Sequence, residues 1–390
     1  MSPPGRPKGE HRSPKREGCL SGQQRRRFVA GGLVAAAAAA VGAPVAAQAP
    51  GSVRWRLRTQ YGRGHDLVVA SLALLAERLS AMTAGRFRLD VETRDDGTLR
   101  SPLFDAVRGG EFDAVHLDAS TLVENDPLFA FLGAIPYGMT ARQHDAWLRH
   151  GNGLATLRPA LQRHGVVVFP AGGTGVEMGG WYRREIKGTA DLKELKVRSF
   201  GVGAGVLARL GVAVQRMPDG EVTAALQAGR LDGAVGAGPY DDERQGWYKF
   251  ARFYYYPLAA GGGHQFVVLA RAEAWAALPA DLKAAFEAAC TDAGQDVAAR
   301  YGAQTPRALR QLLANGVQLR PFPPEVARAG YAAAEEALAA AGGGNEAFRQ
   351  VHTAWRAFRD DQLRAFGLAD SRNAGLLHSL VVAPGAPVAK

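Results

Sequence analysis

Cysteine is scarce in this sequence, and long apolar runs are missing. Only Cys19 and Cys290 are cysteines among 390 residues. Neither a disulfide framework nor a cysteine-based metal site is therefore expected. The most apolar stretch, residues 30–41, is shorter than the roughly 20 residues that cross a bilayer. The chain is long enough for two domains of ordinary size, and their stability must come from packed apolar cores.

Familiar catalytic motifs are missing as well. The sequence contains no His-Glu-x-x-His, no Gly-x-Ser-x-Gly and no phosphate-binding Gly-x-x-x-x-Gly-Lys-Ser/Thr. Two glycine-rich segments, 171–175 and 201–205, lack the dinucleotide-binding spacing, so we interpret them as loops that approach a ligand or a neighbouring strand. We expect no enzymatic activity from these patterns.

The histidines and acidic residues give no strong metal pattern. No two histidines have a short metal-binding spacing, and His116 and His264 lie in apolar strand contexts typical of core histidines. The acidic run 241–243 could supply oxygen ligands to a cation, or it could complement the dipole at a helix N-terminus. The second interpretation is the more common one.

The first 49 residues carry an export pattern. Three arginines at 25–27 precede Phe28, an alanine-rich apolar run follows, and small residues near 45–49 suit cleavage. A basic region, a short apolar region and a small-residue cleavage site together predict a signal peptide. The Arg-Arg-x-Phe-Val order is similar to twin-arginine signals, which export folded proteins. We therefore predict a twin-arginine-type signal peptide over 1–49 and a periplasmic location.

Removing this leader changes the charge balance. The whole chain has a formal net charge of +10, and the leader contributes +6 through eight basic and two acidic residues, which leaves +4. A pI near 9.8 would by itself suggest nucleic acid. With only a mild positive charge left and no basic stripe, we expect no nucleic-acid partner.

Strand and helix patterns alternate along the rest of the chain. Period-two and compact apolar patterns predict strands at residues 53–58, 87–91, 112–117, 166–169, 196–200, 212–217, 231–235, 265–270 and 317–321. Helical spacing predicts helices at residues 65–82, 102–108, 280–313, 324–341 and 346–366. This alternation predicts an α/β fold with mostly parallel strand pairing.

One ten-residue pattern occurs twice. Residues 106–115 and 225–234 both fit A-[VL]-x-[GA]-G-x-[FL]-D-[AG]-[VA]. The pattern describes a helix that ends on a glycine with left-handed backbone angles and is followed by a short strand. Any α/β protein can reuse such a corner, but two copies also fit two similar lobes with a ligand cleft between them. We favour the second interpretation.

Candidate recognition residues lie in the middle of the chain. Aromatic residues gather at 181–182, 247–248 and 253–256, where they could form ligand-cavity walls or a lobe core. Arg198 lies on the predicted strand 196–200, where few arginines are found, although a single arginine is more commonly a solvated surface residue. A guanidinium at that position could bind a carboxylate through two parallel hydrogen bonds.

At these residues the chain resembles a known family. The matching segments are 169–172, 178–181, 191–198, 225–232, 238–242 and 254–257. Together they resemble the solute-binding subunit of tripartite ATP-independent periplasmic (TRAP) transporters, most closely the branch that binds 2-oxo acids and related monocarboxylates. The resemblance covers about 53–366. It implies two α/β lobes joined by hinge strands and a long helix, and an arginine, here Arg198, that clamps the ligand carboxylate.

The sequence departs from that branch at four positions. Where the branch has glutamine, glutamate, tryptophan and asparagine around ligand and cation, this chain has Glu177, Val235, Gly236 and Gly173. A bridging cation could survive only if Glu177 reaches it. Alternatively, Glu177 pairs with Arg198 or recognises an amine or hydroxyl of the ligand. Gly236 should enlarge the pocket, so we do not assume a pyruvate-like ligand.

These observations lead to one prediction of architecture. We predict a two-lobed periplasmic binding-protein fold, with lobe 1 over 50–170, lobe 2 over 171–270, long helices and a returning strand over 271–366, and a loosely ordered tail over 367–390.

They also lead to one prediction of function. We expect capture of a small organic carboxylate by lobe closure and delivery to TRAP permease subunits. The ligand would lie between Arg198, Glu177 and Met178 on one side and Val235, Gly236 and Tyr240 on the other. We expect no cofactor apart from the uncertain cation, and the C-terminal helices would suit a homodimer. A periplasmic sensory protein and a cofactor-bearing oxidoreductase are the alternatives.

Overall fold

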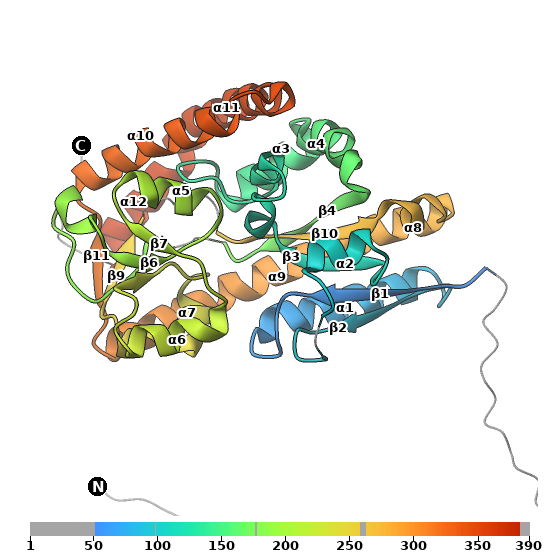
Figure 1. Cartoon of the computed structure of the whole chain (residues 1–390), viewed down its shortest axis with the longest axis horizontal. Coiled ribbons are helices and arrows are strands. Elements are labelled where there is room, and N and C mark those ends of the chain that lie inside the picture. Colours follow the sequence, from blue (N-terminus) through green and yellow to red (C-terminus); the bar gives the residue numbers. More distant parts are fainter. Residues whose placement is uncertain (1–50, 98, 176–177, 258–262, 383–390) are drawn as a thin grey trace, which may run out of the picture. The chain divides into compact units, whose positions relative to one another are not determined.

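The computed structural model describes residues 51–97, 99–175, 178–257 and 263–382, which belong to one compact unit, Gln48–Lys390. The predicted leader and Glu177 lie outside these residues. The described chain forms two mixed sheets with helices packed around them (Figure 1). No helix in this part of the chain is long and apolar enough to cross a membrane.

The first sheet has the strand order β2-β1-β3-β10-β4. Its strands are β1 Val53–Thr59, β2 Phe87–Glu92, β3 Ala114–Asp118, β4 Val166–Gly173 and β10 Gln265–Arg271. The first three run parallel, and β10 runs antiparallel to both β3 and β4. Trp55, Phe87 and Phe286 of helix α9 (Ala280–Ala314) pack together in one core of this sheet.

The second sheet has the order β11-β9-β5-β8-β6-β7. Its strands are β5 Gly180–Tyr182, β6 Lys196–Arg198, β7 Ala213–Gln215, β8 Gly233–Ala234, β9 Phe253–Tyr256 and β11 Gln318–Pro321. Trp181 and Tyr254 stack face to face with ring centroids 3.9 Å apart. The aromatic residues at 181–182 and 253–256 therefore lie on the adjacent strands β5 and β9. Most of them are buried in the core of this lobe and do not form a cavity wall.

The helices surround these sheets. Those before the second sheet are α1 Asp66–Met82, α2 Leu103–Arg108, α3 Ala141–His150 and α4 Gly153–Leu161. Those among and after its strands are α5 Gly201–Arg209, α6 Asp219–Gln227, α7 Pro239–Gln245, α8 Ala272–Ala276, α9 Ala280–Ala314, α10 Pro324–Ala341, α11 Glu346–Phe366 and α12 Arg372–Leu377. Short 3₁₀ segments at 119–122, 127–132, 162–164, 189–192 and 247–249 link them, and single π-helical turns flank α12.

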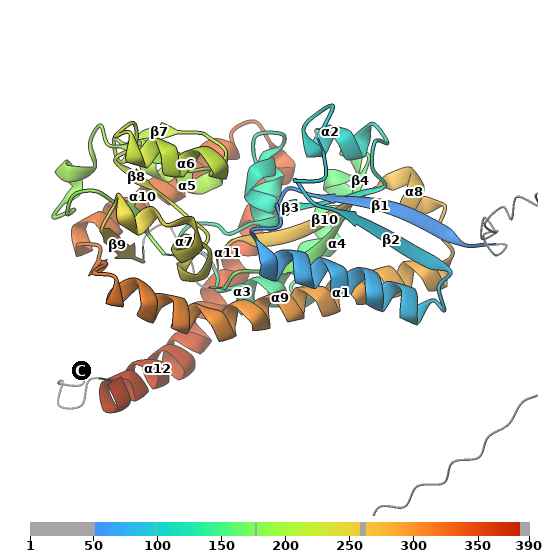
Figure 2. The ribbon, with the colours of Figure 1, turned by 90° about the horizontal axis from the view of Figure 1, so that it is seen from below.

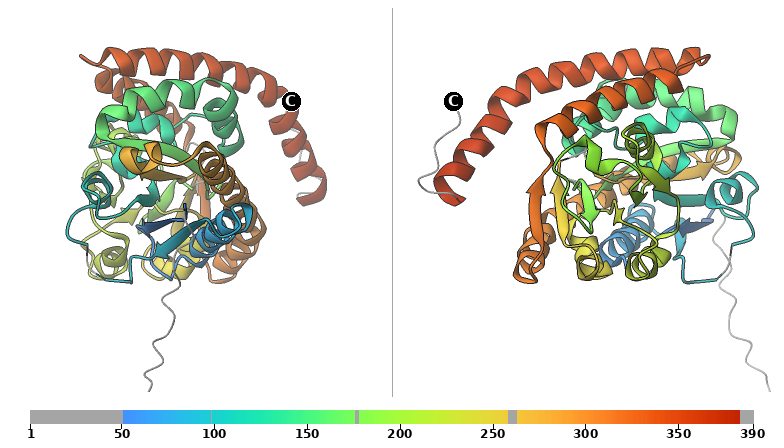
Figure 3. Two further views of the ribbon diagram at one scale, coloured as in Figure 1. Left: turned by 90° about the vertical axis from the view of Figure 1, so that its right-hand side faces the viewer. Right: turned by 60° about the vertical axis from the view of Figure 1, so that its left-hand side comes forward.

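Three long helices pack on the two halves. Helix α9 contacts α1 and β4 of the first half and α7 of the second (Figure 2). Helix α10 packs on α5, whereas α11 packs on α4 and the 127–132 segment of the first half (Figure 3). Helix α9 therefore contacts both halves, whereas α10 packs on the second half and α11 on the first.

The repeated corner has the same geometry in both halves. Gly110 and Gly229 have φ of 76° and 70°. In each copy the aspartate exchanges hydrogen bonds with the adjacent parallel strand: Asp113 bonds to the backbone of Arg56, and Asp232 to that of Lys196. The corners lead into β3 of one sheet and β8 of the other. The interpretation as two similar lobes is confirmed.

Three expectations differ from the structure. The predicted lobe 2, 171–270, includes β10, but this strand is hydrogen-bonded to β3 and β4 of the first sheet, because the chain crosses back after β9. Pairing is mixed rather than mostly parallel, since one antiparallel crossing strand enters each sheet. The tail is helical as far as 382, where a loosely ordered segment was expected.

Candidate functional site

The carboxyl ends of parallel strands from both sheets face two adjoining cavities. In the first sheet, Gln60 follows β1 and Asp118 is the last residue of β3. In the second sheet, Arg198 is the last residue of β6 and Val235 follows β8. Ligands of open α/β sheets bind outside these strand ends. The cavities thus lie where the fold places a ligand.

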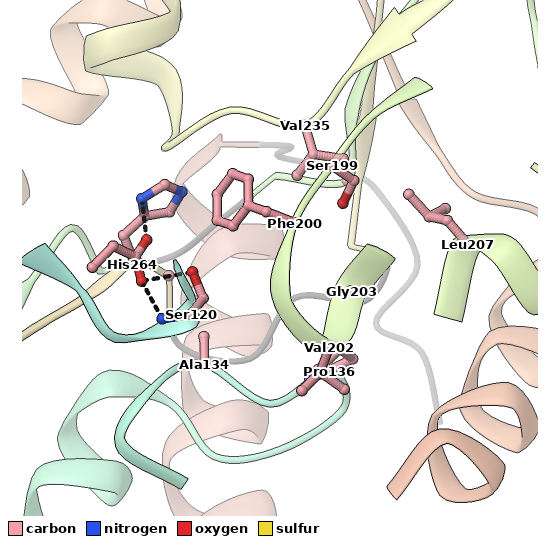
Figure 4. Close-up of a pocket in the computed structure, with 13 residues that line it drawn as sticks. Ser120, Ala134, Pro136, Ser199, Phe200, Val202, Gly203, Leu207, Val235 and His264 are labelled. Atoms are coloured by element: carbon pink, nitrogen blue, oxygen red, sulfur yellow. Dashed lines mark hydrogen bonds and ion pairs between the residues drawn. The ribbon is translucent and has the colours of Figure 1, made fainter. Parts of the chain in front are cut away.

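Cavity 1 is the space drawn in Figure 4, and cavity 2 adjoins it. Cavity 1 contains Ser120, Ala134, Pro136, Gly179, Ser199, Val202, Gly203, Leu207, Val235 and Gly263. Cavity 2 contains Gln60, Tyr61, His65, Thr121, Arg198, Gly236, Ala237, Asp241, Asp242, Gln245 and Trp247. Asp118, Phe200 and His264 line both. Most residues of cavity 1 are small or apolar, whereas cavity 2 has most of the charged side chains.

Arg198 is a buried cation in the wall of cavity 2. It is 7% exposed. Its Nη1 donates to the carbonyl oxygen of Val235 at 2.9 Å and its Nε to that of Met217 at 3.4 Å. The guanidinium carbon lies 4.6 Å from the centre of the Phe200 ring. These contacts fix the plane of a group whose five N–H donors suit a carboxylate.

Asp118 and His264 lie against each other at the boundary between the cavities. His264 Nδ1 lies 2.7 Å from Asp118 Oδ2, and Asp118 Oδ1 accepts from the backbone N–H and hydroxyl of Ser120 (Figure 4). Burial alone would raise the pKa of Asp118, but the His264 charge and the Ser120 bonds outweigh it, so this pKa lies below its usual range. Asp118 is therefore a carboxylate held ionised at the cavity wall.

His116 lies deeper in the same sheet and does not reach either cavity. Its Nδ1 is 3.0 Å from the hydroxyl of Thr59. Burial lowers its pKa to about 3, although the nearby Asp118 opposes this shift. The interpretation of His116 as a satisfied core histidine is confirmed. For His264 that interpretation is wrong, because the residue precedes β10 and faces the cavities.

The acidic pair at 241–242 opens helix α7, as the helix-terminus interpretation expects. Asp241 accepts a hydrogen bond from the Tyr301 hydroxyl at 2.7 Å. Asp242 accepts from Trp181 Nε1 and from the Tyr254 hydroxyl. Burial raises the pKa of Asp242 to about 7 against the effect of these two bonds. Across the described ranges, no three His, Cys, Asp or Glu side chains gather as a metal site.

The structure places the six predicted site residues in different surroundings. Arg198, Val235 and Gly236 line the cavities. Met178 packs among the aromatic residues of the second sheet, beside the cavity-lining Gly179. Tyr240 is absent from both linings, and its hydroxyl donates to Asp66 of α1 at 3.1 Å. Glu177 lies outside the described residues.

Gly236 does not simply enlarge the pocket. A Cβ atom at this position would lie 2.0 Å from Asp242 Oδ1 and 2.8 Å from a carbon of the Trp247 ring. Real Cβ atoms make no such contacts, so the neighbouring side chains already occupy that space. The expectation of extra room at this point is wrong, because Asp242 has taken the place that a side chain would fill.

Two halves that place charged residues around cavities at their strand ends define an extracellular solute-binding protein. The comparisons agree with this class. Residues 61–342 match the family described as bacterial extracellular solute-binding protein, family 7 (DctP). The chain belongs to this family, which carries solutes for transport.

Similar proteins have been described in other bacteria. A monocarboxylate 2-oxoacid-binding periplasmic protein of Nostoc sp. is 36% identical over 308 residues, 79% of this chain and 84% of that protein. A TRAP transporter solute-binding protein of Bordetella bronchiseptica, 34% identical with a TM-score of 0.81 over 85% of this chain and 98% of that one, formed a mixed-occupancy dimer with calcium and picolinate in one site. A Pseudoalteromonas atlantica protein, 28% identical with a TM-score of 0.78 over 83% and 98%, held sodium and pyruvate.

Proposed function

We propose that this protein captures a small organic monocarboxylate and delivers it to the membrane subunits of a TRAP transporter. The observation that carries the proposal is the buried guanidinium of Arg198 in the wall of cavity 2, fixed by two carbonyl oxygens and the Phe200 ring. Relatives that hold pyruvate or picolinate support a carboxylate as the ligand. A charge-assisted hydrogen bond in a low-dielectric cavity provides the anchor.

Binding then favours the conformation in which both halves contact the ligand. Arg198, Val235 and Gly236 belong to the second half, whereas Gln60 and Asp118 belong to the first. A ligand that touches both sets stabilises the arrangement that brings them together. We infer that this conformation is the one that the membrane subunits recognise.

A bridging cation is poorly supported by the described residues. Calcium or sodium accompanies the ligand in the relatives. Here Val235 and Gly236 can offer only backbone oxygens, and the Val235 carbonyl already accepts from Arg198. Glu177, our sequence-based candidate for a metal ligand, is not among the described residues. We propose that the carboxylate is bound without a bridging cation, and that affinities measured with calcium and with a chelator will agree.

Replacing Arg198 tests the anchor. Thermal shifts on adding pyruvate, lactate or picolinate should be lost in Arg198→Ala and reduced in Arg198→Lys, since removing one partner of a buried charge pair costs about 2–5 kcal/mol of binding. Arg209→Ala on the exposed side of α5 is the matched control and should keep the full shift. A full ligand-induced shift in Arg198→Ala would show that the carboxylate binds elsewhere.

We also propose that residues 1–49 direct twin-arginine export. The consecutive arginines before Phe28 support this. Changing Arg25 and Arg26 to lysine should leave the protein in the cytoplasm, as measured by cell fractionation. Normal export of the unchanged protein in cells without the twin-arginine translocase would contradict the assignment.

A homodimer fits the carboxyl-terminal helices. Leu363, Leu368 and Leu377 are exposed on α11, the following turn and α12. The Bordetella bronchiseptica relative formed a dimer. We propose that a second copy covers these leucines, so light scattering should give twice the chain mass, and a variant with all three changed to serine should be monomeric. A wild-type monomer at micromolar concentration would refute this.

A further inference from the structure

Asp242 is an acidic residue in the lining of cavity 2, and one of its carboxyl oxygens is held by two hydrogen bonds. Oδ2 accepts from Trp181 Nε1 at 2.9 Å and from the Tyr254 hydroxyl at 2.7 Å. These two donors belong to stacked rings in the core of the second sheet. The residue is 2% exposed. The orientation of the carboxyl group is therefore set by the sheet and not by solvent.

The other oxygen, Oδ1, stands where a side chain at position 236 would begin. A Cβ there would lie 2.0 Å from it, and both Gly236 and Asp242 line cavity 2. Among the hydrogen bonds of the described residues, none ends on Oδ1. Only glycine at 236 allows this oxygen to remain at the cavity wall.

The electrostatic surroundings favour a neutral partner for Oδ1. The pKa of Asp242 is raised to about 7, mainly by burial and in smaller part by the neighbouring Asp241, against the opposing effects of the Trp181 and Tyr254 bonds and of His264. Arg198 and the ionised Asp118 also line the cavity. Near neutral pH the carboxyl group exists both protonated and ionised. A hydroxyl can donate to one form and accept from the other, whereas an ammonium requires the ionised form.

We propose that Asp242, exposed to the cavity by Gly236, is a specificity-determining residue that binds a hydroxyl group of the ligand, so that the substrate class is hydroxy monocarboxylates. This inference rests on the proposed function: Arg198 binds the carboxylate of the ligand, and Asp242 binds its hydroxyl group. A ligand without the hydroxyl leaves a buried polar oxygen unsatisfied, and sites of this kind discriminate strongly against such analogues.

Matched acids that differ only in the hydroxyl test the proposal. The pairs are lactate with propionate, 3-hydroxybutyrate with butyrate, and mandelate with phenylacetate, measured by calorimetry on the mature wild-type protein at pH 7 with a chelator present. In at least one pair the hydroxy acid should bind roughly tenfold to a hundredfold more tightly.

Two variants connect that preference to Asp242. Gly236→Ala should reduce it to below about twofold, because the new methyl group displaces Oδ1. In Asp242→Asn the amide oxygen must keep accepting from Trp181 and Tyr254, so the NH₂ group faces the cavity. The affinity for pyruvate should therefore rise relative to the affinity for lactate. Gly220→Ala, where a Cβ meets no atom within 4 Å, is the control and should bind like the wild type. Circular dichroism and Tm verify that each variant is folded.

The outcomes separate this inference from the proposed function. Failure of all six acids, and of pyruvate and picolinate as well, to bind the wild type overturns the proposed capture of small monocarboxylates, and the inference with it. Binding of pyruvate or picolinate when all six acids fail overturns the inference alone. Tight binding without any preference between pair members overturns the inference alone. A preference that survives unchanged in folded Gly236→Ala, or that requires added calcium, also overturns it, because neither fits a direct bond to Oδ1.

Discussion

Replacing Asp242 by asparagine should change how the stability of the protein depends on pH. The pKa of Asp242 is about 7 in the folded protein against an ordinary 3.8, mainly because of burial. A raised pKa means that the folded state binds the proton more tightly, so this stabilisation is complete below pH about 4 and is lost as the pH rises to about 7. A shift of about three units corresponds to roughly 4 kcal/mol. Asparagine is neutral throughout.

The assay is urea unfolding of ligand-free wild type and variant between pH 4 and pH 8. The stability of the wild type relative to Asp242→Asn should fall by up to about 4 kcal/mol across this range, with most of the change below pH 7. His116 is not among the groups that shift the pKa of Asp242. Its titration should therefore be alike in both proteins, and the subtraction removes its contribution. A difference that stays constant within about 0.5 kcal/mol would show that the carboxyl titrates alike in the folded and unfolded states, which would refute the reasoning.

Three more changes test other parts of the structure. Gly172→Ala, at φ +84° and with its Cβ 2.3 Å from a carbonyl oxygen of α9, should lower the free energy of unfolding in urea by about 2–4 kcal/mol. Gly165→Ala, at φ +69° in open space, should lower it by only about 1–2 kcal/mol. Equal losses of stability would contradict the close approach of β4 and α9. Tyr240→Phe removes the hydrogen bond to Asp66 that joins the halves, so ligand Kd should rise about twofold to tenfold, and an unchanged Kd would show that this bond does not support closure. Cys290 is buried and burial raises the pKa of its thiol, so a thiol reagent should react only after unfolding; rapid reaction of the native protein would contradict its placement in the core.

Long helices were the part of the fold that sequence patterns predicted best. Helices α10 and α11 have the predicted bounds, and α9 differs by one residue at its end. Long amphipathic periodicity leaves few alternatives. The strands β5 and β8 have only three and two residues, too few for an alternating pattern, so β5 was not predicted at all. Their positions depend on pairing with distant strands.

Arg198 was a sequence-based candidate mainly through the resemblance to TRAP solute-binding subunits, and the structure places it in the lining of cavity 2. Tyr240, predicted from the sequence to line the ligand site, is absent from both cavity linings and donates to Asp66 instead. Helix periodicity does not tell which half of the protein its hydroxyl will meet. The partnership of Asp118 and His264 was also missed. These residues end β3 and precede β10, and only the antiparallel pairing of those strands brings them together.

The sequence by itself determined the α/β class, the two copies of one helix-to-strand corner, and an arginine, Arg198, at the end of β6. These features depend on local periodicity and local backbone angles, which neighbouring residues specify. Only the tertiary structure decided that the Asp242 side chain occupies the space next to Gly236, and that one of its oxygens accepts hydrogen bonds from Trp181 and Tyr254. Burial and pairing between distant segments set both its proton affinity and its direction, and neither can be read from spacing along the chain.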